Sequence, residues 1–192
     1  RDLHLSIRRQ RQVCIRDRGL AHLQAFAAGL GVREVQVASR SAQSAQALVD
    51  QARAMGLQAT TVEDVEAAAR HCPLIVTCTP ARAVVLREAP RSDAFISAVG
   101  AFTSQMVELA PGLCQGLLQS GRVVVDTGDA LHEAGDLLQA GIDVAALPTL
   151  EQVVREQWPR SDSPVLFKCC GWGGWDLAAT RLAMRRAALQ NS

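Results

Sequence analysis

The sequence has no tyrosine and only one lysine, Lys168. Without tyrosine, one common general acid is excluded from any catalytic site. No apolar run approaches the roughly 18 residues that a membrane-spanning helix needs, and the pattern of a secretory signal is missing. These absences predict a soluble protein without a membrane partner.

An excess of charge of one sign is missing as well. The chain carries 20 Lys and Arg against 19 Asp and Glu, a net charge of +1, which gives no general attraction for nucleic acid. We therefore expect no nucleic-acid partner. The 192 residues, 48% of them hydrophobic, suffice for the core of one domain and leave little for a second.

CxxC pairs are also absent, although the chain has six cysteines: Cys14, Cys72, Cys78, Cys114, Cys169 and Cys170. Several lie in apolar segments, so we interpret them as buried free thiols of a reducing compartment rather than as disulfides or metal ligands. The side chains of adjacent cysteines diverge, which argues against a metal shared by Cys169 and Cys170. The expected location is the cytoplasm, and no metal site is predicted.

Residues 1–18 differ from the rest of the chain, because they contain six arginines and no clear periodicity. Such a segment could be a basic arm that touches phosphates. We favour a disordered or foreign segment, with the natural domain covering residues 19–192.

From Gly19 onward, segments with helical spacing alternate with short apolar runs. The pattern predicts helices over 20–30, 41–56, 61–71, 111–119, 132–140, from 149 and over 175–189, and strands over 34–39, 57–60, 74–79, 95–100, 123–126 and 165–167. This order predicts an α/β fold with a doubly wound parallel sheet, a Rossmann-like dinucleotide-binding domain.

Individual residues refine the expected elements. Ser41 and Thr149 are predicted N-caps, and Thr61 with Asp64 resembles a capping box. After Thr149, the side chains of Leu150, Val153 and Val154 are expected to point inward. In the last helix, the side chains available for packing are Leu177, Thr180, Leu182 and Met184.

Polar residues follow the predicted strands. Right-handed crossovers would bring the carboxyl ends of the strands to one edge, where open α/β sheets bind ligands. The run from Leu74 to Thr79 reads as a strand buried on both faces, and we interpret Thr77, Cys78 and Thr79 as the floor of a cofactor site. The other strand exits are Ser39-Arg40, Val99 to Ala101, Asp126-Thr127 and Cys169 to Gly171.

Ser39-Arg40-Ser41 after the strand 34–39 indicates the type of dinucleotide. An acid at this position reads a ribose hydroxyl, whereas an arginine accommodates a 2′-phosphate. Arg40 and Ser41 therefore favour NADPH over NADH. The glycine-rich turn expected before the first helix is missing, and the charged side chains of Arg16, Asp17 and Arg18 should weaken the approach of a pyrophosphate.

Several motifs together resemble those of the ornithine cyclodeaminase/mu-crystallin family, especially its Δ1-pyrroline-2-carboxylate/Δ1-piperideine-2-carboxylate (ketimine) reductases. The resemblance covers Gly19 to the end of the chain. The motifs are Ser39-Arg40-Ser41, Thr77-Cys78-Thr79-Pro80, Ala98 to Thr103 with Met106 to Leu109, Val125-Asp126-Thr127, Glu133 to Leu137, and Phe167 to Gly171 with Asp176.

The resemblance implies NAD(P)H with its nicotinamide near Thr77 to Thr79, Val99, Gly100, Ala101 and the loop of Cys170 and Gly171. It implies a homodimer and reduction of a small cyclic imino acid. Phe102 stands where the cyclodeaminases carry a catalytic aspartate, which argues against ornithine deamination. The family's catalytic Lys and substrate-binding Arg belong to an amino-terminal domain that the match does not include. The catalytic residues therefore remain unknown, and we expect this chain alone to be inactive.

Two other interpretations stay open: a non-catalytic NADPH or small-ligand binding module of the crystallin type, and an inert product that folds without partners. The remaining polar candidates have ordinary alternatives. His132 and Glu133 could be an acid/base pair or surface residues, and Asp126 could contact the site or cap a turn. Asp136 and Asp176 are expected to be caps or packing partners, and Trp172 and Trp175 could line a pocket or anchor the last helix.

Overall fold

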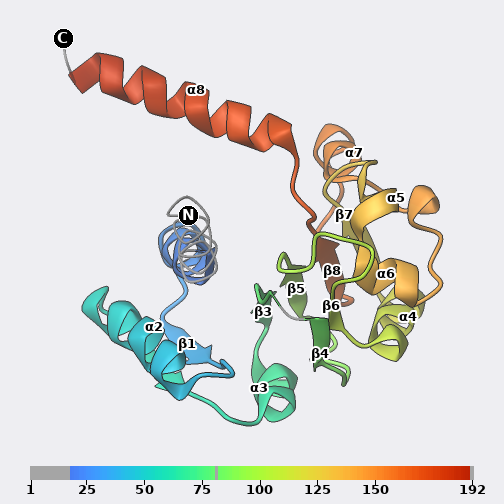
Figure 1. Cartoon of the computed structure of the whole chain (residues 1–192), viewed down its shortest axis with the longest axis horizontal. Helices are drawn as coiled ribbons and strands as arrows, with labels where there is room; N and C mark the ends of the chain where they lie inside the picture. The colour runs from blue at the N-terminus through green and yellow to red at the C-terminus, as the bar shows by residue number, and fades with distance from the viewer. Residues whose placement is uncertain (1–17, 81, 191–192) are drawn as a thin grey trace, which may run out of the picture.

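The computed structural model of the protein describes residues 18–80 and 82–190. Residues 18–30 are helical, so Arg18 is part of the first helix, whereas the predictions for residues 1–17 lie outside the described part of the chain. Figure 1 shows the elements that follow. They are β1 Glu34–Val37, α2 Ala42–Ala54, β2 Gln58–Thr61, α3 Val65–His71, β3 Leu74–Thr77, β4 Arg82–Leu86, β5 Phe95–Ala98, β6 Val107–Leu109, α4 Pro111–Ser120, β7 Arg122–Val125, α5 Ala130–Glu133, α6 Gly135–Gln139, the 3₁₀ turn η1 Val144–Ala146, α7 Leu150–Arg155, β8 Val165–Lys168 and α8 Gly173–Gln190.

All strand pairs are parallel, which confirms the predicted α/β architecture. The strands are distributed over three sheets: β1 pairs with β2, β4 pairs with β6, and the central sheet has the order β3-β5-β8-β7. In the central sheet, Thr77 is level with Ala98, Ala98 with Lys168, and Lys168 with Val125. The last residues of four strands therefore lie in one row, and the chain leaves all four at the same edge.

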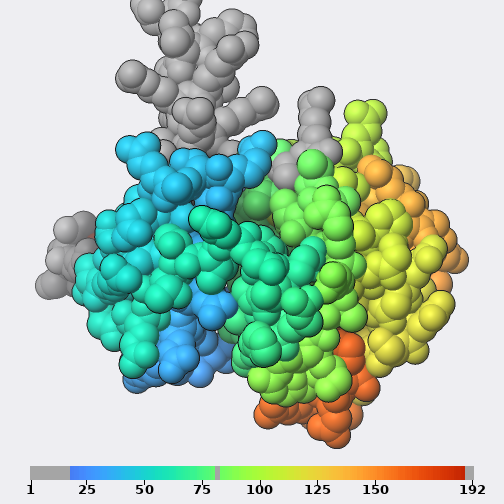
Figure 2. All heavy atoms as spheres, turned by 90° about the horizontal axis from the view of Figure 1, so that it is seen from below, coloured from blue at the N-terminus to red at the C-terminus, as the bar shows by residue number. Residues whose placement is uncertain are grey.

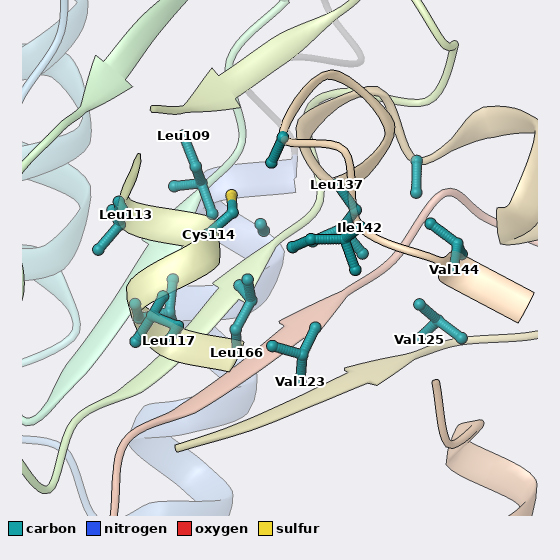
Figure 3. Packing of buried hydrophobic residues seen from close by; sticks show 14 of the residues in the cluster. Leu109, Leu113, Cys114, Leu117, Val123, Val125, Leu137, Ile142, Val144 and Leu166 are labelled. Atoms are coloured by element: carbon teal, nitrogen blue, oxygen red, sulfur yellow. The ribbon is translucent and has the colours of Figure 1, made fainter. Parts of the chain in front are cut away.

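Two hydrophobic clusters form the core. The larger one joins the central sheet to α4, α5 and α6. Figure 3 shows Leu117 of α4 beside Leu166 of β8, with Val123 of β7 next to Leu166. The smaller cluster holds the helix 18–30 and α2 against β1 and β2, through side chains such as Leu23, Val37 and Val49. Figure 2 shows the residues of β1, α2 and β2, blue to cyan, beside the green residues of α3 and β3.

Two of the three helix caps predicted from the sequence are found in the structure. The Ser41 hydroxyl accepts from the Ser44 amide at the start of α2, and Thr149 forms a capping box with Gln152 at the start of α7. The predicted cap at Thr61 is wrong. Thr61 ends β2, and Asp64 caps α3 by accepting from the Ala67 amide at 2.9 Å, because a carboxylate next to the first turn reaches the free amides directly.

Three other expectations need correction. The predicted helix 132–140 is divided into α5 and α6 at Ala134, and Val154 in α7 is 68% exposed rather than inward. Leu74 to Val76 are only half-buried, because β3 is the outer strand of the central sheet among the described residues. The short strands β4 and β6 were not predicted.

Over residues 173–188, where its side chains are described, the last helix α8 has no buried apolar face, so the predicted packing of this helix is wrong. It extends away from the rest of the chain (Figure 1), and Leu177, Leu182 and Met184 are 52%, 52% and 68% exposed. Trp172 and Trp175 form an edge-to-face pair with ring centroids 5.9 Å apart at its start. Among the described residues, no helix has both the length and the apolar character to span a membrane.

Candidate cofactor site

The candidate site lies where the chain leaves β3, β5, β7 and β8. The four strands end in one row, so the residues after them, Cys78, Val99, Asp126 and Cys169, follow at the same edge of the sheet. Gly19 of the helix 18–30 lies beside this edge, because a Cβ atom added at Gly19 would lie 3.6 Å from Cys78 Sγ. The shared carboxyl edge of parallel strands is the place where open α/β sheets bind ligands.

The turns after β3 and β5 share one buried carboxylate, that of Glu108 in β6, which is 0% exposed. Its Oε1 accepts from the Thr79 amide at 2.6 Å and from the Thr79 hydroxyl at 3.0 Å. Its Oε2 accepts from the Thr77 hydroxyl at 3.0 Å and from the amides of Gly100 and Ala101 at 2.7 and 3.2 Å. Five donors thus converge on one side chain, as a carboxylate removed from water requires.

A buried ion pair lies behind Glu108. Asp136 in α6 accepts from the amides of Glu108 and Leu109 through Oδ1, at 2.5 and 2.8 Å. Its Oδ2 is 2.9 Å from Lys168 Nζ as an ion-pair contact rather than an aligned hydrogen bond, and both side chains are 0% exposed. Lys168 Nζ also donates to the Ala101 carbonyl at 2.5 Å. Through Lys168, the ion pair therefore also binds the turn after β5.

A second carboxylate holds the loop after β8. Asp126, 2% exposed, accepts through Oδ2 from the amides of Cys170 and Gly171 at 2.9 and 2.8 Å. Its Oδ1 accepts from the Thr127 amide at 2.9 Å. Of the two roles predicted for Asp126, the observed contacts are those of a cap. Gly171 has φ +98°, a conformation that favours glycine.

The structure brings most of the predicted site residues together. Glu108 binds Thr77, Thr79, Gly100 and Ala101 directly. Cys78 lies between two of these residues and Val99 precedes a third, while Cys170 is fixed by Asp126 at the same edge. Arg40 and Ser41 follow β1, which belongs to another sheet, and both are exposed.

Arg18 reaches into the candidate site from the first helix. Its Nη1 donates to the Val99 carbonyl at 3.3 Å, and its guanidinium lies 5.8 Å from the centroid of the Phe102 ring. Phe102 is 45% exposed. The charged side chain therefore contacts the turn after β5, and the weaker approach of a pyrophosphate stays a prediction.

Glu108 and Lys168 are the residues that sequence reasoning missed. Two signals were available: Glu108 stands between Val107 and Leu109 in a buried strand, and Lys168, the only lysine, ends an apolar strand. Two of the other polar candidates, His132 and Asp176, have no contact with these site residues among the described interactions. His132 is exposed, and Asp176 lies in the first turn of α8.

The five described cysteines are free thiols, as predicted, although only Cys114 is fully buried. No group of metal-ligating side chains is found within residues 18–80 and 82–190. Burial raises the pKa of Cys170 to about 12, and burial with the nearby charge of Asp126 raises the pKa of Cys169 to about 11. Burial, and then the Glu108 carboxylate, raise the pKa of Cys78.

These pKa values predict slow alkylation. Because the thiolate is the reactive form, we expect iodoacetamide to modify Cys169 and Cys170 at pH 8 at least about tenfold more slowly than a free cysteine. Below these raised pKa values the thiolate fraction grows with pH, so the rate should rise about tenfold per unit from pH 8 to 10. Peptide mass spectrometry after timed labelling measures the rates, with urea-unfolded chain as the control. Native rates equal to unfolded rates would contradict the prediction.

The buried ion pair gives a second prediction. Lys168→Met leaves the Asp136 carboxylate buried without its cation, and we expect the free energy of unfolding to fall by about 3–5 kcal/mol. Arg155→Met is the matched control, because Arg155 pairs with Glu151 at the surface, with side chains 62% and 79% exposed; its effect should stay below about 1 kcal/mol. Urea denaturation measures both variants, and equal losses would contradict a special role of the buried pair.

A sequence profile of the ornithine cyclodeaminase/mu-crystallin family matches residues 13–190. The chain belongs to the ornithine cyclodeaminase/mu-crystallin family. Within this family, it is 36% identical over 162 residues to the Δ1-pyrroline-2-carboxylate reductase 2 of Burkholderia ambifaria, covering 84% of this chain and 50% of that protein. It is also 36% identical over 172 residues to the Δ1-pyrroline-2-carboxylate/Δ1-piperideine-2-carboxylate reductase of Azospirillum brasilense, covering 86% and 53%.

The chain thus spans about half the length of these relatives of the ornithine cyclodeaminase/mu-crystallin family. Its fold matches the Δ1-pyrroline-2-carboxylate reductase of Thermococcus litoralis, solved in complex with NADH and L-proline. The TM-score is 0.80 at 20% identity, with 90% of this chain and 56% of that chain covered. This likeness shows that the two chains share a fold.

Proposed function

We propose that the complete protein reduces a cyclic imino acid, Δ1-pyrroline-2-carboxylate or Δ1-piperideine-2-carboxylate, to the cyclic amino acid with NADPH. In this proposal the present chain is the cofactor-binding part. The observation that carries it is the row of four strand ends, with buried carboxylates holding the turns that follow, in a member of a family with reductases of these imino acids. The names of both curated relatives support the substrate class.

Residues after β1 and residues at the edge of the central sheet fit the two ends of a dinucleotide. Arg40 and Ser41, both exposed, offer a guanidinium and a hydroxyl to the 2′-phosphate. The turns of Thr77 to Thr79, Val99 to Ala101 and Cys170 would hold the nicotinamide end. NADPH, when bound, supplies the hydride; the chain's own turns fix the geometry in which it is presented.

Imine reduction also needs a protonated nitrogen and a clamp for the substrate carboxylate. We assign neither to the described residues. Lys168 is the only lysine of the sequence and is 0% exposed, so it cannot reach a substrate. The catalytic Lys and Arg implied by the family would come from the part of the complete protein outside this match, and we propose a cytoplasmic homodimer for that protein.

Because the described residues supply neither a proton donor nor a carboxylate clamp, they also fit a second candidate, a non-catalytic NADPH-binding module of the mu-crystallin type. Ornithine cyclodeamination is disfavoured, because Phe102 occupies the position where the family resemblance places the aspartate. Oxidation of NADPH, followed by absorbance at 340 nm with Δ1-piperideine-2-carboxylate and the complete gene product, separates the candidates. Turnover supports the reductase, whereas tight NADPH binding without turnover supports the module.

The contact between Arg18 and the Val99 carbonyl leads to a prediction about the affinity of this chain for NADPH. Because Arg18 occupies the Val99 carbonyl, Arg18→Ala should free the turn after β5 and strengthen NADPH binding by about threefold to tenfold, the range expected for the loss of one competing hydrogen bond. Fluorescence of the nicotinamide measures the affinity. Arg87→Ala, which changes another exposed arginine, should leave it unchanged. Weaker binding of Arg18→Ala would mean that Arg18 contacts the nucleotide.

A further inference from the structure

A closed ring of polar contacts links five elements behind the candidate site. It runs from Lys168 in β8 to Asp136 in α6, then to the backbone of Glu108 in β6. From the Glu108 carboxylate it passes to the turns after β3 and β5, and it returns from Ala101 to Lys168. Each member of the ring is held by at least one other member.

We propose that Glu108 is a positioning residue for the nicotinamide half of the cofactor, with Asp136 and Lys168 holding it in place. The inference rests on the proposed NADPH site. Glu108 touches neither solvent nor ligand-accessible space, since it is 0% exposed. It acts through the backbone of Thr79, Gly100 and Ala101, whose amides it orients.

The choice of residue type supports a role in geometry. Burying a carboxylate and an ion pair is no better for stability than packing apolar side chains of the same volume. A carboxylate, however, accepts from several amides at once. The last backbone hydrogen bond between β3 and β5 runs from the Val99 amide to the Thr77 carbonyl at 2.8 Å. Beyond it, the Glu108 side chain joins the turns after the two strands.

Close packing around Gly100 leaves little room for the turns after β3 and β5 to move. A Cβ atom on Gly100 would lie 2.2 Å from Glu108 Oε1 and 2.3 Å from the Thr79 carbonyl oxygen. The two turns and the carboxylate thus fit together with no space for a methyl group. A small change at Glu108 must move at least one turn.

Glu108→Gln tests the proposal with a nearly isosteric side chain. The amide NH₂ would face donors where an oxygen now accepts, so one turn loses its partners. Hydrogen exchange should become at least about tenfold faster at the amides of Thr79, Gly100 and Ala101, while amides of β7 keep their protection. Glu66→Gln is the matched control, because Glu66 also accepts from two backbone amides, of Arg87 and Glu88 at 2.8 and 3.0 Å, away from the site.

The affinities for two ligands then distinguish a positioning role of Glu108 from general damage to the fold. NADPH carries the nicotinamide, whereas adenosine 2′,5′-bisphosphate carries only the adenine half with its 2′-phosphate. We expect Glu108→Gln to weaken NADPH binding by at least about tenfold, as for the loss of a hydrogen bond to a charged group. Binding of the bisphosphate should change by less than about twofold, because its site is built by other residues. Glu66→Gln should change neither.

Three results would overturn the inference: unchanged exchange at the three amides, equal weakening of both ligands, or loosened turns with unchanged NADPH affinity. If the unmodified chain bound neither ligand, the proposed function would fail, and the assignment to the nicotinamide would fail with it. The exchange rates would still decide whether Glu108 fixes the two turns.

A milder variant covers the case in which Glu108→Gln does not fold. Thr77→Val removes one of the five donors, the hydroxyl 3.0 Å from Oε2, and keeps the shape of the side chain. We expect the same changes to be smaller: NADPH binding should be about threefold weaker, and binding of the bisphosphate should be unchanged. An unchanged NADPH affinity here would count against the proposal.

Discussion

Arg40→Ala is expected to weaken NADPH binding by about 10- to 100-fold while leaving NADH binding within about twofold. The reason is that the guanidinium after β1, together with the Ser41 hydroxyl, would pair with the 2′-phosphate that only NADPH carries. Arg40 is exposed, so its removal should leave the fold intact. Nicotinamide fluorescence titrations with both nucleotides measure the change in the preference.

Arg33→Ala provides the control for Arg40. Arg33 is also exposed, and it precedes β1 at the opposite end of the same strand. Its removal lowers the net charge of the chain equally but should not alter the ratio of the two affinities. Equal affinities of the unmodified chain for NADPH and NADH would show that Arg40 does not read the phosphate.

Among glycine-to-alanine substitutions in the candidate site, we expect Gly100→Ala to cause the largest loss of stability and of NADPH binding. The added carbon would overlap Glu108 Oε1 and the backbone oxygen and nitrogen of Thr79, at 2.2 to 2.5 Å. Overpacking of this kind costs about 1–3 kcal/mol or more, and here the turns after β3 and β5 must also separate. We expect this loss in urea denaturation, together with loss of measurable NADPH binding.

Gly116→Ala is the matched substitution. Nothing lies within 4 Å of a Cβ atom at Gly116, which is in the interior of α4. Alanine in place of glycine in such a helix should stabilise the chain by about 0.4–1 kcal/mol. If both alanine variants had the same stability, the close contact at Gly100 would not matter.

The sequence predicted the features that depend on neighbouring residues. The period of apolar residues placed the helix 18–30 and α2, and the apolar runs placed β3, β5, β7 and β8. Ser41 and Thr149 were found as caps because a cap binds amides only three residues away. The common edge of the strands followed from the handedness of parallel connections.

Contacts between distant residues could not be predicted in this way. Glu108 meets Thr77 across 31 residues, and Lys168 meets Ala101 across 67. The sequence shows that both charges lie among apolar neighbours, but not which partners satisfy them. The short strands β4 and β6 were missed for the same reason, since each is defined by its pairing with the other rather than by a pattern of its own.

The position of β8 has a consequence for how the protein is made. This strand fills the gap between β5 and β7, yet the ribosome synthesises it after both of them. The nascent chain therefore carries an incomplete sheet until β8 has emerged, and β5 and β7 cannot join before then. Under the proposed function, nucleotide binding should arise in one step, when β8 closes the sheet and brings Lys168 to Asp136.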